Sequence, residues 1–310
     1  MLAKIILLVT VLLEAMGLPV LAAPLGKTGY RLIRPTPSSA DYPFSFNSLD
    51  LDSSQIPLRP QRKVIFKEPS FAAEGIIALD LPTSTILYQK NSDKVFSLAS
   101  LTKIMTAIVV LDNYKLDEEI ATPPEAVVVS GSKINLRPGE VLKVKDLLYG
   151  LLLYSGNDAA YTLASKLGEE RFVAKMNQKA QDLGLETFYF VDPIGLDKDN
   201  RGSLKDVAFL ASVALRYPLF AEIVRTNEYT IFSVDRRLQH PLKNTNRLLR
   251  EYPGTFGVKT GYTEEAGHCL ISAVEREHHR VLAVVVHHPH DQFTESKKLF
   301  DWIFTSYQWQ

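Results

Sequence analysis

The chain has 310 residues and is 46% hydrophobic, which is enough apolar material for one large core or two modest ones. Its 35 basic residues balance its 35 acidic residues, so the formal net charge is zero. This charge balance argues against nucleic acid as a partner. The single cysteine, Cys269, excludes an intrachain disulfide and is expected to be a small core residue.

The N-terminus has the composition of a secretory signal. A short basic start precedes the apolar run 5–13, and helix-breaking and small residues follow up to Ala22. We therefore expect a signal peptide at residues 1–22 and export to the periplasm or another extracytoplasmic space. The alternative is an uncleaved segment that tethers the protein to the membrane, although Glu14 interrupts an apolar run that is short for a span.

The next segment changes composition. Residues 23–69 contain prolines at 35, 37, 43, 57, 60 and 69 with serine and aspartate between them. Most of this segment has neither helical nor strand periodicity, which predicts an extended proline-rich tether or arm. The globular pattern begins after it, so one domain is expected at residues 70–310.

Hydrophobic periodicity predicts the elements of that domain in the order strands, helices, strands and a final helix. This order favours an α+β fold in which both ends of the domain complete one sheet around an inserted helical region. The predicted strands are 74–79, 85–89, 256–260, 266–274 and 281–287, and the predicted helices are 101–112, 141–153, 157–167, 170–183, 203–214 and 295–304.

The first predicted helix begins with a possible catalytic pair. Ser100 and Lys103 are three residues apart, so their side chains meet on one helix face. A desolvated lysine in contact with a serine hydroxyl can remove its proton. Ser130 and Lys133 have the same spacing, but they lie in a strand or turn context where such residues point to opposite faces. We therefore prefer Ser100.

A second polar group lies between two apolar helical stretches. A loop there can project Ser155 and Asn157 into a cleft, where the hydroxyl relays a proton and the amide orients a substrate carbonyl or the lysine. The alternative is that one of these residues caps the helix that follows.

The tetrapeptide Lys-Thr-Gly-Tyr occurs at 27–30 and again at 259–262. In the second copy, Lys259 and Gly261 share one side of a predicted edge strand, where the glycine lets a substrate backbone lie close. Lys259 and the hydroxyl of Thr260 or Thr263 could bind a carboxylate. The alternative is an exposed strand lysine followed by a glycine turn.

The order of the three groups is more specific than any one of them. Ser-x-x-Lys, Ser-x-Asn and Lys-Thr-Gly, on helix, loop and strand in that sequence, are typical of penicillin-recognising serine enzymes. They stand at residues 100, 155 and 259, whereas the tetrapeptide copy at 27 precedes the serine and breaks the order.

From residue 73 to residue 307 the chain resembles the low-molecular-weight penicillin-binding proteins, which are serine-type D-alanyl-D-alanine carboxypeptidases of peptidase family S11. The resemblance implies a β-lactamase/transpeptidase-like fold, with an antiparallel sheet flanked by helices and an inserted all-helical subdomain. The matching segments are 99–106, 146–152, 155–160, 176–177, 183–185, 192–196, 244–246 and 257–263.

The same resemblance implies roles for the site residues. Ser100 would attack the carbonyl between two D-alanines with Lys103 as general base, while Ser155 passes the proton to the leaving amine beside Asn157. Lys259 and Thr260 would hold the terminal carboxylate, and the backbone N–H groups of Ser100 and Tyr262 would form the oxyanion hole. The substrate strand is completed by Gly261 and Thr263. The implied partners are peptidoglycan stem peptides and β-lactams as covalent inhibitors, with no cofactor and no metal.

The chain departs from the family pattern in three respects. Asp192 stands where many relatives have asparagine, and Gln292 stands before Phe293 where arginine is common. The chain also stops at Gln310, without the C-terminal β-rich domain and amphipathic membrane anchor of many carboxypeptidases. Short relatives include endopeptidases that cut cross-links between stem peptides, so a D,D-endopeptidase is the first alternative.

Three further alternatives stay open. A class A-like β-lactamase would need a Glu-x-x-Leu-Asn loop to hydrolyse its acyl-enzyme, and the chain has no Leu-Asn dipeptide. A non-catalytic wall-binding protein could use the same fold. The histidine-rich stretch 287–291 could collect zinc, although a solvated loop is the preferred interpretation.

Overall fold

The computed structural model describes residues 22–24, 30–32, 59–63 and 65–309. The chain forms two compact units, Met1–Ile56 and Pro57–Gln310. In the first unit the described part is an antiparallel pair of β1 (Ala22–Pro24) and β2 (Tyr30–Leu32). The predicted signal peptide before Ala22, and most of the predicted arm, lie outside the described residues.

The second unit begins before the expected boundary at residue 70. Strand β3 (Gln61–Arg62) pairs with β15 (Tyr307–Gln308) at the other end of the chain. The indole of Trp302 also donates to the carbonyl of Lys67. The end of the expected arm therefore belongs to the compact unit, and a two-residue pairing is too short to have a detectable period.

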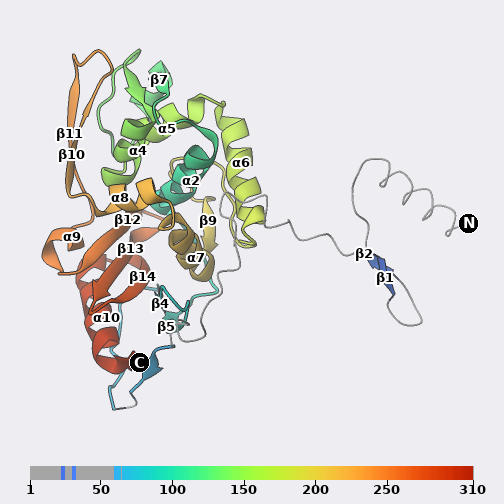
Figure 1. Ribbon diagram of the computed structural model, residues 1–310, viewed down its shortest axis with the longest axis vertical. Coiled ribbons are helices and arrows are strands. Elements are labelled where there is room, and N and C mark those ends of the chain that lie inside the picture. Colours follow the sequence, from blue (N-terminus) through green and yellow to red (C-terminus); the bar gives the residue numbers. More distant parts are fainter. Residues whose placement is uncertain (1–21, 25–29, 33–58, 64, 310) are drawn as a thin grey trace, which may run out of the picture. The chain divides into compact units, whose positions relative to one another are not determined.

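The second unit is built on a five-stranded antiparallel sheet with the order β12-β13-β14-β4-β5 (Figure 1). As predicted, its strands come from both ends of the unit, and the β4–β5 pair follows the expected hairpin. The strands are β4 (Gly75–Asp80), β5 (Ile86–Lys90), β12 (Thr255–Thr263), β13 (Gly267–Arg276) and β14 (His279–His288).

Both faces of this sheet are covered. Ile76 and Ala78 belong to the core cluster that contains Phe300 of α10 (Gln292–Ser306), whereas Ile77 and Leu79 belong to the cluster shared with the inserted region. This alternation follows from the two-residue repeat of a strand. Two buried faces explain why the central strands are continuous apolar runs in the sequence.

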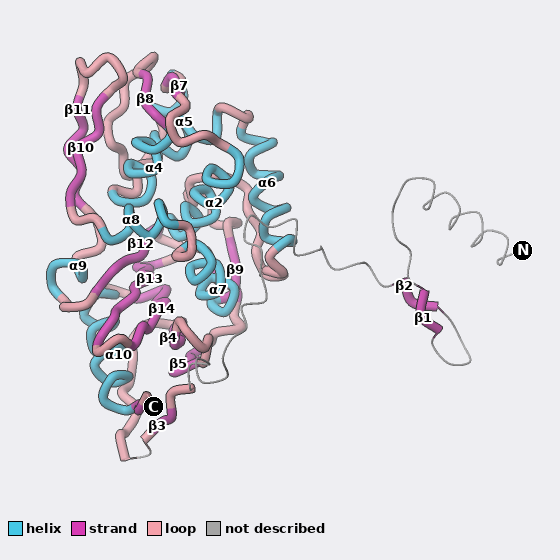
Figure 2. The backbone as a smooth tube through the Cα atoms, viewed as in Figure 1, coloured by secondary structure: helices cyan, strands magenta, loops and turns pink. Residues whose placement is uncertain are grey.

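The region between β5 and β12 is mainly helical, and most of its helices lie above the sheet in Figure 2, whereas α7 and α9 lie beside it. The α+β class is therefore confirmed, but three short strand pairs, β6–β9, β7–β8 and β10–β11, were not predicted. The helices are η2 (Ala99–Thr102), α2 (Lys103–Asn113), α3 (Pro124–Val128), α4 (Val144–Leu153), α5 (Asn157–Ser165), α6 (Glu169–Asp182), α7 (Leu204–Ala214), α8 (Pro218–Arg225) and α9 (Leu248–Glu251). The short strands are β6 (Val95–Ser97), β7 (Glu119–Ala121), β8 (Val141–Lys143), β9 (Arg201–Ser203), β10 (Glu228–Phe232) and β11 (Gln239–Lys243).

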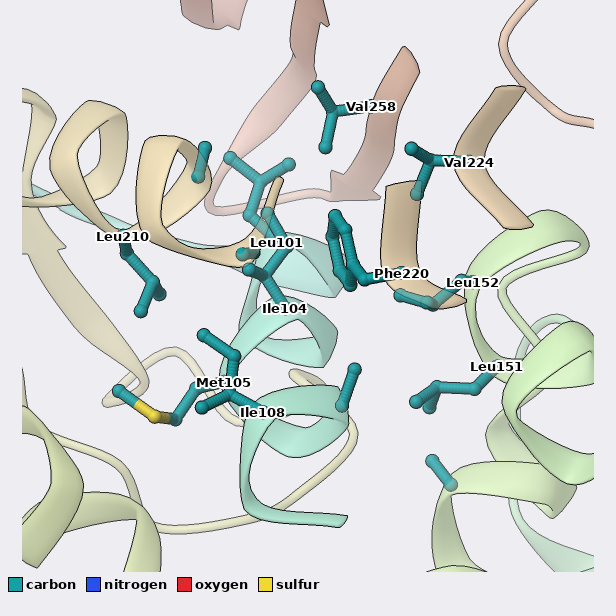
Figure 3. Packing of buried hydrophobic residues seen from close by; sticks show 14 of the residues in the cluster. Leu101, Ile104, Met105, Ile108, Leu151, Leu152, Leu210, Phe220, Val224 and Val258 are labelled. Atoms are coloured by element: carbon teal, nitrogen blue, oxygen red, sulfur yellow. The ribbon is translucent and has the colours of Figure 1, made fainter. Parts of the chain in front are cut away.

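One apolar cluster fixes the start of α2 against the sheet (Figure 3). Leu101 of η2 and Ile104 of α2 point toward Phe220 of α8, and Val258 of β12 lies in the same cluster. All four side chains are almost fully buried. The cluster therefore joins the turn that carries Ser100 to the strand that carries Lys259.

Among the described residues, no single helix is both long and apolar enough to cross a membrane. Helices α7 and α8 together reach the required length and composition, but the chain bends by 103° between them.

The cluster makes a prediction about stability. Phe220→Ala should lower the free energy of unfolding by about 3–5 kcal/mol, because it removes a fully buried aromatic ring and leaves a cavity. Urea unfolding followed by circular dichroism measures the change. Phe209→Ala is the matched control, because that ring is 47% exposed, and a similar loss in both variants would contradict the assigned packing.

Candidate active site

Ser100 lies on the short helical turn η2 and not inside an α-helix. The buried residues on either side of it, Ala99 and Leu101, hold the turn in the core, and Ala99 has a positive φ of 45°. A non-glycine residue in this region is strained and persists only when its surroundings hold it. The packing of the turn thus places the Ser100 hydroxyl at a fixed point.

Lys103 is the first residue of α2 and is fully buried. Its amine donates to the hydroxyl of Ser100 at 2.9 Å and to the carbonyl of Ile194 at 2.6 Å. Burial lowers the pKa of this amine from 10.5 to about 7, while the carboxylates of Asp192 and Asp158 act in the opposite direction. An amine with this pKa is partly neutral near pH 7 and can accept a proton.

Ser155 lies between α4 and α5 with a positive φ of 64°. Its hydroxyl accepts a hydrogen bond at 2.8 Å from the amine of Lys259, which also donates to the carbonyl of Thr260 at 2.8 Å. Burial lowers the pKa of the Lys259 amine well below its ordinary value, and the nearby charge of Lys103 lowers it further. The loop and the strand therefore meet through this pair, and Lys259 is not an exposed strand lysine.

Asn157 is held by the loop that precedes β8. Its side-chain amide donates to the carbonyl of Ser130 at 2.6 Å, and its backbone N–H donates to the carbonyl of Ser132 at 2.7 Å. Its buried Oδ1 atom has no hydrogen-bond partner among the described residues. Helix α5 begins after Gly156 without a side-chain cap, so the capping alternative does not apply to Ser155 or Asn157.

The rejected pair, Ser130 and Lys133, does not come together. The Lys133 amine donates to the carbonyl of Val127 at 3.1 Å and makes no hydrogen bond with Ser130. Ser130 contributes to this region through its backbone carbonyl.

Strand β12 is an edge of the sheet and runs beside η2. A Cβ atom on Gly261 would lie 3.2 Å from the backbone nitrogen of Ser100 and 3.3 Å from the Cβ atom of Ala99. The missing side chain therefore makes room for the Ser100 turn, whereas the sequence suggested room for a substrate backbone. This close fit brings the edge strand against the nucleophile.

The remaining strand residues differ in their surroundings. The hydroxyl of Thr260 lies 2.7 Å from that of Thr245, a residue that the spacing of motifs did not single out. Tyr262 is 58% exposed and packs on the ring of His268, whereas the Thr263 hydroxyl accepts the Ala266 N–H in the turn after the strand. Thr260 is thus better placed than Thr263 to offer a hydroxyl beside Lys259.

Comparisons with known proteins agree with this arrangement. Residues 62–290 match the family described as D-alanyl-D-alanine carboxypeptidase, peptidase family S11. The D-alanyl-D-alanine carboxypeptidase DacF of Bacillus subtilis is 36% identical over 78% of this chain, which spans 64% of that relative. The D-alanyl-D-alanine endopeptidase of Escherichia coli is 32% identical over 77% of this chain and 79% of its own.

This chain belongs to the S11 D-alanyl-D-alanine carboxypeptidase family. The crystal structure of the Streptomyces K15 DD-transpeptidase supports the same conclusion, with 34% identity and a TM-score of 0.73 over 77% of this chain and all of that one. The expected β-lactamase/transpeptidase-like fold is thereby confirmed.

The S11 site includes a turn that the motifs did not identify. The carbonyl of Ile194 accepts from Lys103, and the carbonyl of Pro193 accepts from the Thr106 hydroxyl at 2.6 Å. Gly195 has a φ of 86°, and a Cβ atom there would lie 1.9 Å from the carbonyl oxygen of Ala99. The resemblance to the family marked these residues, but backbone acceptors give no residue-type signal of their own.

The histidine-rich stretch does not form a metal cluster. Both ring nitrogens of His288 are engaged, since Nδ1 accepts from the backbone N–H groups of His290 and Asp291 and Nε2 lies 2.5 Å from Glu295. In the part of the chain that the structure describes, no group of three or more potential ligands could hold a metal ion.

The buried amine makes a prediction about stability. Lys103→Met should raise the free energy of unfolding at pH 7 by about 1–2 kcal/mol. The wild-type chain pays a desolvation cost to bury this amine, and a methionine side chain of similar length does not. Between pH 7 and 10.5 the unfolded wild-type chain binds more protons at Lys103 than the folded chain does, so wild-type stability rises with pH in this window.

The advantage of the variant should therefore be largest near pH 7 and shrink toward pH 10.5. Urea unfolding at several pH values measures it, with the exposed Lys115→Met as the control. A variant that is less stable than the wild type at pH 7 would mean that burial of the amine does not dominate.

Proposed function

We propose that this protein hydrolyses the terminal D-alanyl-D-alanine bond of peptidoglycan stem peptides through a serine acyl-enzyme. The observation that carries the proposal is the buried Lys103 amine, 2.9 Å from the Ser100 hydroxyl and partly neutral near pH 7. Family membership supplies the substrate class.

The acylation step uses Ser100, Lys103 and Ser155. The proton of the Ser100 hydroxyl moves to the Lys103 amine while the Ser100 oxygen forms a bond to the carbonyl carbon between the two D-alanines. The carbon–nitrogen bond then breaks, and the proton held by Lys103 passes through the hydroxyl of Ser155 to the leaving amine. Water then attacks the ester carbon with Lys103 as the base, the bond from that carbon to the Ser100 oxygen breaks, and the proton taken from the water restores the Ser100 hydroxyl as the shortened peptide leaves.

Backbone groups stabilise the negative charge that develops on the carbonyl oxygen. The close approach of Gly261 to Ser100 supports an oxyanion hole formed by the N–H groups of Ser100 and Tyr262. The unpartnered Oδ1 atom of Asn157 supports a role in orienting the substrate amide or the Lys103 amine.

The terminal carboxylate of the substrate is assigned to Lys259 and to the paired hydroxyls of Thr260 and Thr245. In the free protein, burial lowers the pKa of the Lys259 amine. An arriving carboxylate favours the charged form of the amine, so binding and protonation of Lys259 support each other.

A D,D-endopeptidase is the second candidate. The relative from Escherichia coli carries the name endopeptidase, and it matches 77% of this chain, against 78% for the Bacillus subtilis carboxypeptidase. The apolar run at residues 5–13 supports export, and an exported enzyme would carry out either activity outside the cytoplasmic membrane. A retained N-terminal segment would hold the enzyme at the membrane surface.

The nucleophile is tested with a β-lactam, which acylates a serine of this kind. Ser100→Ala should abolish labelling by a fluorescent penicillin and lower D-alanine release at least ~10³-fold, because the variant lacks the hydroxyl that forms the acyl-enzyme. The matched control is Ser130→Ala, which has the same Ser-x-x-Lys spacing and should label normally. Persistent labelling of the Ser100 variant would refute the assignment, and rapid repeated penicillin hydrolysis by the wild type would favour a β-lactamase.

The scissile bond is tested with purified peptidoglycan fragments. We expect release of free D-alanine from pentapeptide monomers, detected by a coupled oxidase assay. Conversion of cross-linked dimers to monomers without free D-alanine would instead identify a D,D-endopeptidase. A protein that binds both substrates, cleaves neither and takes up no penicillin label would instead be a non-catalytic wall-binding protein.

A further inference from the structure

We propose that Asp192 is a positioning residue for Lys103: its carboxylate holds the backbone turn that fixes the lysine amine, and its negative charge sets the pH range of the reaction. This inference rests on the proposed serine acyl-enzyme function. It gives a role to a residue that the sequence marked only as a departure from the family pattern.

The carboxylate of Asp192 organises the turn directly. Its Oδ1 atom accepts from the backbone N–H groups of Ile194 at 2.6 Å and Gly195 at 2.5 Å, and its Oδ2 atom accepts from that of Asp197 at 2.8 Å. The Asn200 side chain makes two hydrogen bonds to the backbone of Asp192. Its Oδ1 atom accepts from the Asp192 N–H at 3.2 Å, and its Nδ2 atom donates to the Asp192 carbonyl at 3.1 Å. Charge-assisted bonds of this kind are among the stronger hydrogen bonds in proteins.

Ile194 links this carboxylate to the catalytic amine. Its N–H donates to Asp192, and its carbonyl accepts from Lys103 at 2.6 Å. Gly195, held by the same carboxylate oxygen, packs against the carbonyl of Ala99 beside the nucleophile. Asp192 therefore controls where the acceptor of Lys103 lies relative to Ser100.

The charge of Asp192 acts on the same amine. The charged groups that face Lys103 are Asp192 on this turn, Asp158 on α5 and Lys259 on β12. The two carboxylates favour the protonated amine, whereas burial opposes it and has the larger effect. Removing the charge of Asp192 removes one of two contributions that oppose burial, so Lys103 should lose its proton at a lower pH.

The test is the pH dependence of the second-order rate constant for acylation of Ser100 by a fluorescent penicillin. Asp192→Asn keeps an acceptor for Ile194 and Gly195 but removes the charge. We expect the acid limb of the profile to move about one pH unit lower, at the small end of the effect of a nearby charge. Below pH 6 the variant should then react several-fold faster, relative to its own plateau, than the wild type does.

Asp197→Asn is the matched control, because it removes the same charge from an exposed position on the same turn. Its acid limb should coincide with that of the wild type. Asp192→Ser is a second neutral variant, and thermal unfolding identifies which variants are folded. A purely structural role would lower the plateau of the Asp192 variants without moving the acid limb.

Two outcomes separate this inference from the proposed function. A wild-type protein that is not acylated by penicillin would refute the proposed function itself. A wild type that is acylated, with folded Asp192 variants whose acid limb stays in place or matches that of Asp197→Asn, would overturn the role of Asp192 alone.

Discussion

The site depends on one amine, that of Lys103, which is fully buried away from solvent. Lys103 replaces its hydration with two bonds, one to the Ser100 hydroxyl and one to the Ile194 carbonyl. Burial makes the uncharged amine accessible near neutral pH, and the chemistry of the serine follows from that state. Packing around α2 and β12 matters because it keeps water away from this amine.

The backbone around the amine is held in unusual conformations. Ala99 and Ser155 both have positive φ values. Ala99 directly precedes the nucleophile Ser100, and Ser155 itself carries the second hydroxyl of the site. Such conformations cost about 1–3 kcal/mol each and persist only inside a well-packed surround. The buried cluster of Figure 3 provides this packing, and it joins the helical insertion to the sheet in one continuous core.

The sequence predicted the long elements well, because periodic burial determines them. The sheet strands and the helices α5, α6, α7 and α10 lie close to their expected ranges, whereas three-residue strands such as β8 (Val141–Lys143) have no period to detect. The predicted helical context likewise favoured Ser100 over Ser130, although both have a lysine three residues on. The sequence could not identify the Ile194 carbonyl as a partner of Lys103, because any residue type can supply a backbone acceptor. Nor could it show that Gly261 packs against the Ser100 turn, because that contact depends on the tertiary structure.

The pairing of β3 with β15 determines where the chain enters the second unit. Tyr307 of that pair donates its hydroxyl hydrogen to the carbonyl of Leu87 in β5, the edge of the sheet opposite β12. Four inter-strand steps separate those edges, which is about 19 Å at the usual strand spacing. The described N-terminal end of this unit therefore lies at the edge of the sheet farthest from the strand that carries Lys259.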